Sequence, residues 1–387
     1  MYQTTQADTY RKCSEMKKAD VIVIGAGAIG CAIAYFLGKE GLKTIVVEQD
    51  SIGAHASGFA PGILSPLGVA LESMEAELPL IARSLKIHKE LSQQLPAEAG
   101  IDYYFRQSAL LKLAFTHTEA QGLNVEVDML RQQGFNVRWL DGDAVRLIES
   151  RISPETIGAA YSEEAAELDS YRYVLALAQA AEKHGAEIRH GQLYGLKRKE
   201  GKLTAIQLSS GEIACDCVVL AMGPWTGLAS SSLGFPIPIE PQKGQTLRVR
   251  ASGLPFTTMF AWGSYYNSTT RPDSLIYHGA THEDAGFNEE PTVEGRDELL
   301  HSLITMVPSL TEAEVVLQTV CLRPVPADGL PVIGKVPGWD GVYLASGHWT
   351  KGILLSPVTA LMITQLILTG AASIPTEPFS IARFNSS

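Results

Sequence analysis

The sequence predicts an α/β protein in which a parallel sheet, assembled from separate stretches of the chain, carries an inserted second domain. Three observations lead to this fold class. Residues 19–48 run from apolar strand through glycine turn and alanine-rich helix to a second strand. The C-terminal residues return to strand, glycine turn and apolar helix. The length of 387 residues equals roughly two to three typical domains.

The opening elements predict a βαβ unit. Residues 21–24 are an apolar strand, a glycine turn follows, and a helical pattern continues to about Lys39. A second strand covers residues 44–47. Two strands joined through a helix in this way lie parallel in one sheet.

Composition and periodicity predict the later elements. We expect helices at residues 71–95, 118–133 and 171–184, and strands at residues 109–115, 136–140, 187–198, 204–208, 217–220 and 275–278. The turn 199–202 separates two of these strands, and the strand 217–220 ends in a glycine turn that reaches Trp225.

Prolines divide the chain between two domains. Pro236, Pro238 and Pro241 indicate a crossing into a strand-rich stretch that ends near Cys321. We therefore expect a discontinuous first domain, an inserted α+β domain on a largely antiparallel sheet, and an N-terminal extension. The predicted ranges are 1–18 for the extension, 19–75, 150–235 and 321–387 for the first domain, and 76–149 and 236–320 for the second.

Charge and cysteine content favour a small-molecule partner. Lysine and arginine number 31 against 42 acidic residues, and the net charge of -11 with no basic block argues against nucleic acid. The five cysteines form no CxxC pair and no zinc-ligand spacing, so we expect no metal site and a reducing compartment. The first twenty residues lack the apolar stretch of a signal peptide, which favours the cytoplasm.

One segment has the apolarity of a membrane span. Residues 352–370 carry no charged side chain, but they include Ser356, Pro357 and Thr359. We therefore predict a buried helix of a large α/β core, and no membrane span.

Gly25, Gly27 and Gly30 form a dinucleotide fingerprint between the first strand and the first helix. Gly25 permits the tight turn, Gly27 lets backbone amides approach a pyrophosphate, and Gly30 allows close packing of helix on strand. Glu48 ends the next strand, where a carboxylate accepts hydrogen bonds from ribose hydroxyls. This context favours the interpretation that the glycine loop binds a dinucleotide over the interpretation that it only allows close packing. It does not distinguish NAD from FAD.

Four further stretches resemble one family. They are residues 56–64 (ASGFAPGIL), the strand end 218–225, residues 321–334 (CLRP through DGLPVIG) and residues 347–357 (GHWTKGILLSP). Together with the fingerprint they are similar to the FAD-dependent D-amino acid oxidase superfamily, and among its members most similar to glycine oxidases. The resemblance implies a Rossmann-like FAD-binding domain with an inserted substrate-binding domain.

The resemblance also implies which residues bind FAD. Leu193 matches the position whose backbone meets adenine, and the turn before residue 352 matches the one that faces the flavin. An uncharged helix that begins near Gly352 would direct its positive end to the negative charge of reduced flavin. The implied FAD-binding residues are Gly25, Gly27, Ala28, Ile29, Gly30, Glu48, Gln49, Ala56, Ser57, Pro61, Gly62, Ile63, Leu193, Gly223, Trp225, Gly347, His348, Trp349, Thr350, Lys351, Gly352, Ile353 and Leu354.

Family members transfer a hydride from the carbon beside an amine to the flavin, and the imine is then hydrolysed. Arg323 matches the glycine-oxidase position that holds a substrate carboxylate, and we expect it to begin a turn after an apolar strand at residues 315–320. Tyr266 matches an active-site tyrosine if one residue is inserted, although a packing role is equally compatible with its pattern. His348 contacts the flavin or satisfies backbone groups, while His278 and His282 are expected to be structural or exposed.

This chain departs from its family at three positions. Sarcosine-type oxidases carry a lysine near Leu354 and glycine oxidases an arginine near Thr350, and neither cation is present here. Arg323 is then the one clear carboxylate anchor. Cys321 stands where sarcosine-type oxidases link FAD covalently, whereas glycine oxidases have glycine there; a link would require activation of the thiolate.

Several alternatives stay open at this point. The expected enzyme oxidises an amino acid or a secondary amine and passes electrons to oxygen, or else to a quinone or another carrier as a dehydrogenase. A flavin-binding interaction protein without turnover would keep the same cofactor motifs. The sequence does not fix the substrate side chain, the stereochemistry or the oligomeric state, a homo-oligomer included.

Overall fold

The computed structural model describes residues 19–263 and 265–384, so the expected extension 1–18 lies outside the described residues. The first sheet has six strands in the order β19, β20, β13, β1, β2, β9. All neighbours are parallel except β19, which pairs antiparallel with β20 at the edge. Its strands are β1 (Val21–Ile24), β2 (Thr44–Glu48), β9 (Glu187–His190), β13 (Val218–Leu220), β19 (Val332–Lys335) and β20 (Val342–Ser346).

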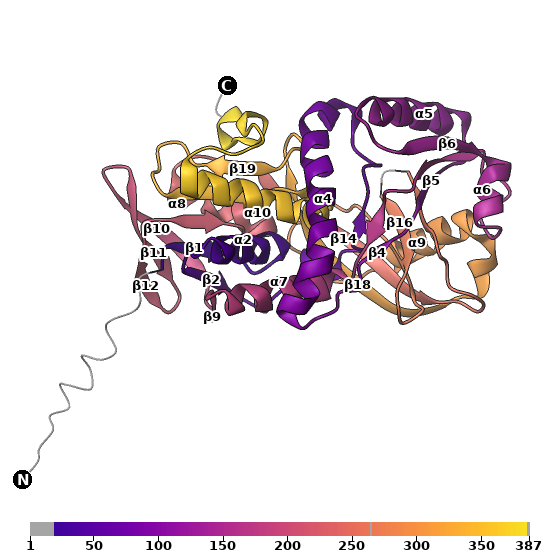
Figure 1. Cartoon of the computed structure of the whole chain (residues 1–387). Helices are drawn as coiled ribbons and strands as arrows, with labels where there is room; N and C mark the ends of the chain where they lie inside the picture. The colour runs from indigo at the N-terminus through magenta and orange to yellow at the C-terminus, as the bar shows by residue number, and fades with distance from the viewer. Residues whose placement is uncertain (1–18, 264, 385–387) are drawn as a thin grey trace, which may run out of the picture.

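Helices α2 and α10 pack directly on strands of this sheet. Helix α2 packs on α7 and α10, while α4 contacts both α7 and α10. Figure 1 shows α10 above α2 in one half of the molecule, with the long α4 standing between the two halves. The helices are α2 (Ala28–Lys39), α4 (Met74–Ala99), α7 (Ser170–Lys183) and α10 (Gly352–Thr369).

The second large sheet has eight strands in the order β18, β14, β17, β16, β15, β5, β7, β6. Only β15 and β5 are parallel neighbours. The strands are β5 (Leu110–Ala114), β6 (Val137–Asp141), β7 (Gly158–Ser162), β14 (Ile239–Arg250), β15 (Met259–Trp262), β16 (Tyr266–Thr270), β17 (Ile276–Gly279) and β18 (Glu314–Pro326). Helices α5 (His117–Gln132), α6 (Gly142–Ile148) and α9 (Val293–Met306) pack on it.

Two smaller sheets complete the fold. One consists of β10 (Leu193–Lys199), β11 (Lys202–Leu208) and β12 (Gly211–Ala214), and the other of β3 (Ile63–Leu64), β8 (Ala166–Glu167) and β4 (Arg106–Gln107). The short helices α3 (Ala56–Phe59) and α8 (Ser230–Leu233) lie in the connections. The predicted fold class, a parallel Rossmann-like sheet with a second, largely antiparallel sheet, is confirmed.

Two strands differ from their sequence expectation. The predicted strand 187–198 is divided at Gly191, because β9 extends the parallel sheet while β10 turns into a separate antiparallel one. Strand β18 continues from Glu314 through Pro326, so Arg323 lies inside a strand and not at the start of a turn. Proline at 324 is tolerated because β18 is an edge strand of its sheet.

Helix α10 is a core helix with an interrupted first turn. Among the described residues, only the helical stretch Trp349–Thr369 has the length and apolarity of a membrane span. Of its most apolar segment of 18 residues, 61% is buried inside the protein. Pro357 has no N–H for the carbonyl of Ile353 four residues earlier. The Nε2 atom of His88 lies 3.1 Å from that carbonyl, and Ser84 donates to the next one at Leu354. Helix α4, through His88, and the hydroxyl of Ser356 thus replace the one donor that the proline lacks.

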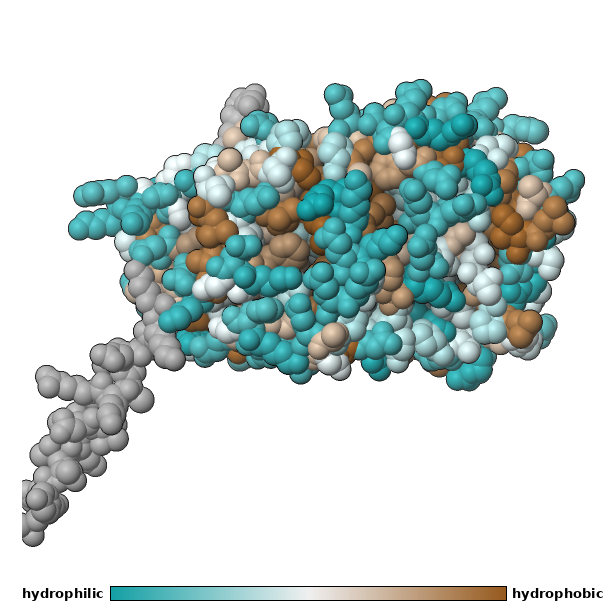
Figure 2. All heavy atoms as spheres, in the orientation of Figure 1, coloured by the Kyte–Doolittle hydropathy of each residue, from teal (hydrophilic) through white to brown (hydrophobic). Residues whose placement is uncertain are grey.

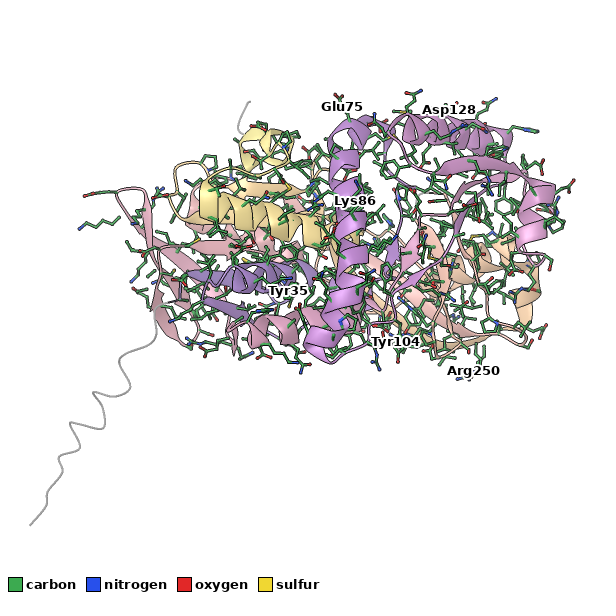
Figure 3. All side chains as sticks on the ribbon, viewed as in Figure 1. Tyr35, Glu75, Lys86, Tyr104, Asp128 and Arg250 are labelled. Atoms are coloured by element: carbon green, nitrogen blue, oxygen red, sulfur yellow. The ribbon has the colours of Figure 1, made fainter. Side chains whose placement is uncertain are left out.

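The surface is mainly hydrophilic on the face drawn in Figure 2. Hydrophobic side chains gather at one end, where α6 exposes 88% of Leu147 and 38% of Ile148. Figure 3 shows Glu75 near one end of α4 and Lys86 farther along it, both from the exposed side of that helix. The opposite side of α4 is buried against α7 and α10.

Buried histidines make the folded state sensitive to acid. Burial lowers the pKa of His88 from 6.5 to about 4. Between pH 6.5 and pH 4 the His88 side chain therefore binds a proton in the unfolded chain but not in the folded chain. The contribution of this histidine to the free energy of unfolding is complete above pH 6.5 and falls as the pH drops toward 4. In the FAD-bound protein, His88→Gln should reduce the loss of unfolding free energy between pH 7 and pH 4 by about 3 kcal/mol.

Urea denaturation at several pH values measures this slope. Glutamine retains a donor for the carbonyls of α10, which limits the direct cost of the substitution. His117→Gln, at an exposed position at the start of α5, is the matched control and should leave the slope unchanged. Parallel curves for the unaltered protein and His88→Gln would refute the prediction.

Candidate functional site

The main cavity begins at the carboxyl ends of the central parallel strands. Strand β1 has β2 on one side and β13 on the other, so connections leave in opposite directions and open a crevice at that edge. The cavity has a volume of about 770 Å³ and is lined by residues of both large sheets. This volume is within the usual range for small-molecule and cofactor sites.

The glycine loop after β1 has no room for side chains. Gly25 has φ of +104°, and a Cβ atom there would lie 2.4 Å from the carbonyl oxygen of Ala221. A Cβ atom at Gly30 would lie 1.8 Å from the carbonyl oxygen of Gly25. The loop therefore brings bare backbone and the start of α2 to the cavity, as a pyrophosphate requires.

Glu48 lies at the end of β2 beside this loop and lines the cavity. Its Oε2 accepts a hydrogen bond from the backbone N–H of Ala26 at 2.6 Å, and its Oε1 accepts one from the backbone N–H of Asp50 at 2.9 Å. These bonds fix the carboxylate in one orientation. Each oxygen retains a lone pair for a ribose hydroxyl, since a carboxylate oxygen accepts more than one hydrogen bond.

A second segment, from α3 to β3, forms another wall of the cavity. The hydroxyl of Ser57 accepts a hydrogen bond from the backbone N–H of Ala28 at 3.0 Å. Gly62 has φ of +70°, and Arg271 reaches across to donate to the carbonyls of Pro61 and Leu168. This buried arginine ties the β3 segment to the eight-stranded sheet.

The C-terminal turn closes the cavity at the start of α10. His348 is buried, with Nε2 2.9 Å from the hydroxyl of Thr359, and burial lowers its pKa to about 3. Lys351 extends to α4, where its Nζ lies 2.7 Å from Oε1 of the buried Glu77. Trp349 donates its indole N–H to Oε1 of Gln242 at 2.9 Å. The side chains of His348, Trp349 and Lys351 are therefore each held by a hydrogen-bond partner.

The residues singled out from the sequence come together in this cavity, with two exceptions. Gly30 and Gly347 do not line it. Gly30 lies against Gly25, and Gly347, with φ of +74°, packs near Ile239. Lining residues are Gly25, Gly27, Ala28, Ile29, Glu48, Gln49, Ala56, Ser57, Pro61, Gly62, Ile63, Leu193, Gly223, Trp225, Tyr266, Arg323, His348, Trp349, Thr350, Lys351, Gly352, Ile353 and Leu354.

Arg323 is buried at the other end of the cavity. It is 7% exposed and lies opposite Gln242 on β14. Its Nη2 donates to the carbonyl of Thr281 at 2.7 Å and its Nη1 to Oε1 of Gln242 at 3.2 Å. A Cβ atom at Gly244 would lie 2.1 Å from Nη2, so this glycine makes the space for the guanidinium.

No carboxylate neutralises this guanidinium among residues 19–263 and 265–384: Arg323 forms no ion pair within that part of the chain. Glu283 influences its pKa, but the Glu283 carboxylate lies 3.2 Å from the buried ammonium of Lys243. Burial lowers the pKa of Arg323, yet a guanidinium keeps its proton in proteins. The cavity therefore presents a buried positive charge to an anionic ligand.

The two adjacent tyrosines point to different surroundings. The hydroxyl of Tyr266 donates to Oε1 of Glu298 on α9 at 2.9 Å. Tyr265 instead stacks on His282, with ring centroids 3.4 Å apart, and lies near Trp349. Side chains alternate between the faces of a strand, so a shift of one residue exchanges their environments.

His282 and Tyr265 are functional candidates that sequence reasoning missed. The sequence predicts that His282 is structural or exposed. In the structure it lines the cavity, close enough to Arg323 for that charge to lower its pKa. The only sequence signal is its position after the strand at residues 275–278. His278, in contrast, is buried between Ser268 and Ser302, as expected for a structural residue.

Cys321 also lines the cavity, opposite Gly244 on β14. The thiol is buried, and this burial raises its pKa even though the charge of Arg323 acts in the opposite direction. A raised pKa lowers the fraction of reactive thiolate.

Together the bare glycine loop, the oriented carboxylate of Glu48 and an enclosed cavity ending at the α10 turn fit a dinucleotide such as FAD. No group of three or more histidine, cysteine or acidic side chains suited to a metal ion occurs within residues 19–263 and 265–384.

Comparison with known proteins gives the same result. The sequence profile of the DAO family, described as FAD dependent oxidoreductase, matches residues 20–366. A glycine oxidase of Geobacillus kaustophilus is 30% identical over 367 residues, covering 94% of this chain and 97% of that protein.

Solved structures agree. The crystal structure of glycine oxidase from Geobacillus kaustophilus has a TM-score of 0.89 at 28% identity, covering 95% of this chain and 99% of that one. L-proline dehydrogenase from P.horikoshii shares the fold, with a TM-score of 0.85 at 22% identity over 95% and 98% of the two chains. The match of the family profile over nearly the whole sequence shows that this chain belongs to the DAO family of FAD-dependent oxidoreductases.

Proposed function

We propose that this FAD-dependent amino acid or amine oxidoreductase acts on a small amino acid whose carboxylate binds Arg323. The single observation that supports this proposal is the buried guanidinium without an ion-pair partner among the described residues. A buried charge of this kind is costly unless an opposite charge meets it. A carboxylate is the partner that the planar guanidinium fork fits best.

FAD bound in this cavity would supply the acceptor for a hydride from the carbon beside the amine. The glycine loop and Glu48 would hold its pyrophosphate and ribose, and residues 348–354 would lie beside the flavin. Arg323 and the neighbouring side chains hold the substrate in one orientation, which is the main catalytic contribution required when the amine arrives uncharged. The resulting imine is hydrolysed in water.

The acceptor of the electrons is proposed to be oxygen, because relatives about 30% identical are named glycine oxidases. A dehydrogenase that uses a quinone or another carrier is the alternative, and a fold shared with an L-proline dehydrogenase is compatible with it. Trp225 and Phe287 stack at the cavity wall, with 6.1 Å between their ring centroids.

Glu48→Ala should weaken the binding of FAD. The substitution removes an oriented acceptor for the ribose hydroxyls, and a hydrogen bond to a charged group typically contributes about 1.5 to 3 kcal/mol. The dissociation constant of FAD should therefore rise roughly 10- to 150-fold, measured by titrating apoprotein with FAD and following fluorescence. Glu212→Ala, at an exposed glutamate that pairs with Lys197, is the matched control and should bind FAD normally. Unchanged affinity in Glu48→Ala would contradict the assignment.

FAD should be released from the protein by acid. The raised pKa of the buried Cys321 thiol disfavours the thiolate that a covalent bond would need. After precipitation with acid, the yellow colour should appear in the supernatant, both for the unaltered protein and for Cys321→Ser. Flavin that stays in the pellet of the unaltered protein, and not of the variant, would establish a covalent link.

Arg323→Ala should lower kcat/KM for an amino acid by roughly two to four orders of magnitude, because removing one member of a buried charge pair costs about 3 to 5 kcal/mol. Arg323→Lys should restore little, since a lysine offers no planar fork. The substrate is first identified with a panel of amino acids and secondary amines, measured with oxygen and with a dye as acceptor.

The decisive comparison is between an acid substrate and its decarboxylated amine. The variant should lose activity on the acid far more than on the amine, while FAD stays bound. Arg250→Ala, which removes an exposed arginine paired with Glu314 on the same two strands (Figure 3 labels Arg250), should leave both activities unchanged. Equal losses on acid and amine would move the proposal to substrates without a carboxylate.

A further inference from the structure

We propose that His282 is a substrate-positioning residue whose Nδ1 atom accepts a hydrogen bond from the amine of a ligand bound to Arg323. The inference rests on the proposed function and extends it to a second anchor. Arg323 recognises one end of an amino acid, its carboxylate. His282 recognises the amine beside it.

The backbone brings the two side chains together. Thr281, the residue before His282, accepts the hydrogen bond from Nη2 of Arg323 at 2.7 Å. The hydroxyl of Thr281 accepts a hydrogen bond from the backbone N–H of Gln245 at 2.9 Å. In return, the backbone N–H of Thr281 donates to the carbonyl of Gln245. This segment is therefore held firmly against β14, and the side chain that follows it lines the cavity.

Aromatic contacts hold the imidazole of His282 in place. Its ring is stacked on Tyr265 at 3.4 Å between centroids, with an angle of 26° between the planes. The ring of Trp349 meets it edge-on at 5.9 Å, and this tryptophan is fixed in turn by Gln242. Gln242 also accepts a hydrogen bond from Arg323, so one network orients both the imidazole and the guanidinium.

The Nδ1 atom of His282 is buried and has no hydrogen-bond partner within residues 19–263 and 265–384. Native proteins rarely leave a buried polar atom unpaired, and such an atom in a ligand cavity indicates a group that arrives with the ligand. Burial and the charge of Arg323 lower the pKa of His282 to about 3, so the ring is uncharged near neutral pH. An uncharged imidazole has one nitrogen that accepts hydrogen bonds.

The shape of an amino acid connects the two anchors. Its amine is attached to the carbon next to the carboxylate, so a carboxylate on Arg323 brings the amine close to the neighbouring imidazole. Two anchors define the direction in which the hydrogen of that carbon points, whereas a single anchor leaves the molecule free to rotate. A simple carboxylic acid would use Arg323 alone.

Two non-oxidisable probes separate these contacts: benzoate carries the carboxylate alone, and 2-aminobenzoate carries an uncharged amine beside it. Binding to the FAD-containing protein is followed by the change in the flavin absorption spectrum. In His282→Leu, affinity for 2-aminobenzoate should fall roughly tenfold, while affinity for benzoate should change less than about twofold. His282→Asn should restore most of the 2-aminobenzoate affinity, because the asparagine oxygen can occupy the place of Nδ1.

The outcomes distinguish this inference from the proposed function. Equal changes for both probes in His282→Leu, or no recovery in His282→Asn, would overturn the role of Nδ1. Failure of benzoate to bind the unaltered protein, or benzoate binding that survives Arg323→Ala, would overturn the carboxylate anchor itself. His278→Asn alters a histidine buried between two serines outside the cavity lining, and it should preserve the ratio of the two affinities.

Discussion

The buried guanidinium of Arg323 is the charge around which the end of the cavity opposite the glycine loop is organised. Its hydrogen bonds to Thr281 and Gln242 satisfy part of its donor capacity but supply no negative charge. Glu283, the acidic side chain that influences it, is already paired with Lys243. The protein thus keeps a desolvated positive charge ready for an anion, and a preorganised charge of this kind requires little rearrangement when the ligand arrives.

Holding such a charge at the end of a nucleotide cavity requires the two large sheets to be fixed to each other. Arg271 of the second sheet donates to the carbonyls of Pro61 and Leu168. Lys351 at the start of α10 pairs with the buried Glu77 of α4, which fixes the C-terminal turn beside the cavity. Both ties use a cation that is itself largely buried. Because a buried cation without its partner is costly, the Arg271 contact favours one position of the second sheet against the β3 segment, and the Lys351 contact favours one position of the turn against α4.

The cavity also keeps its histidines uncharged. Burial lowers the pKa of His348 and of His282 to about 3, and Arg323 adds to the effect at His282. His348 uses Nε2 with Thr359, whereas Nδ1 of His282 has no partner among the described residues. Two histidines of one cavity therefore differ in hydrogen bonding: Thr359 is a partner of His348, and Nδ1 of His282 is left available to a ligand.

The sequence by itself determined the parallel sheet and the cofactor end of the cavity. Gly25 and Glu48 belong to one continuous βαβ unit, so short-range order brings them together without knowledge of the remaining fold. Only the tertiary structure decided the substrate end. Arg323 meets Gln242 through long-range strand pairing and Thr281 through a long-range hydrogen bond. Of two adjacent tyrosines, Tyr265 stacks on His282 while Tyr266 bonds to Glu298. Such contacts depend on register and side-chain direction, which local sequence patterns do not specify.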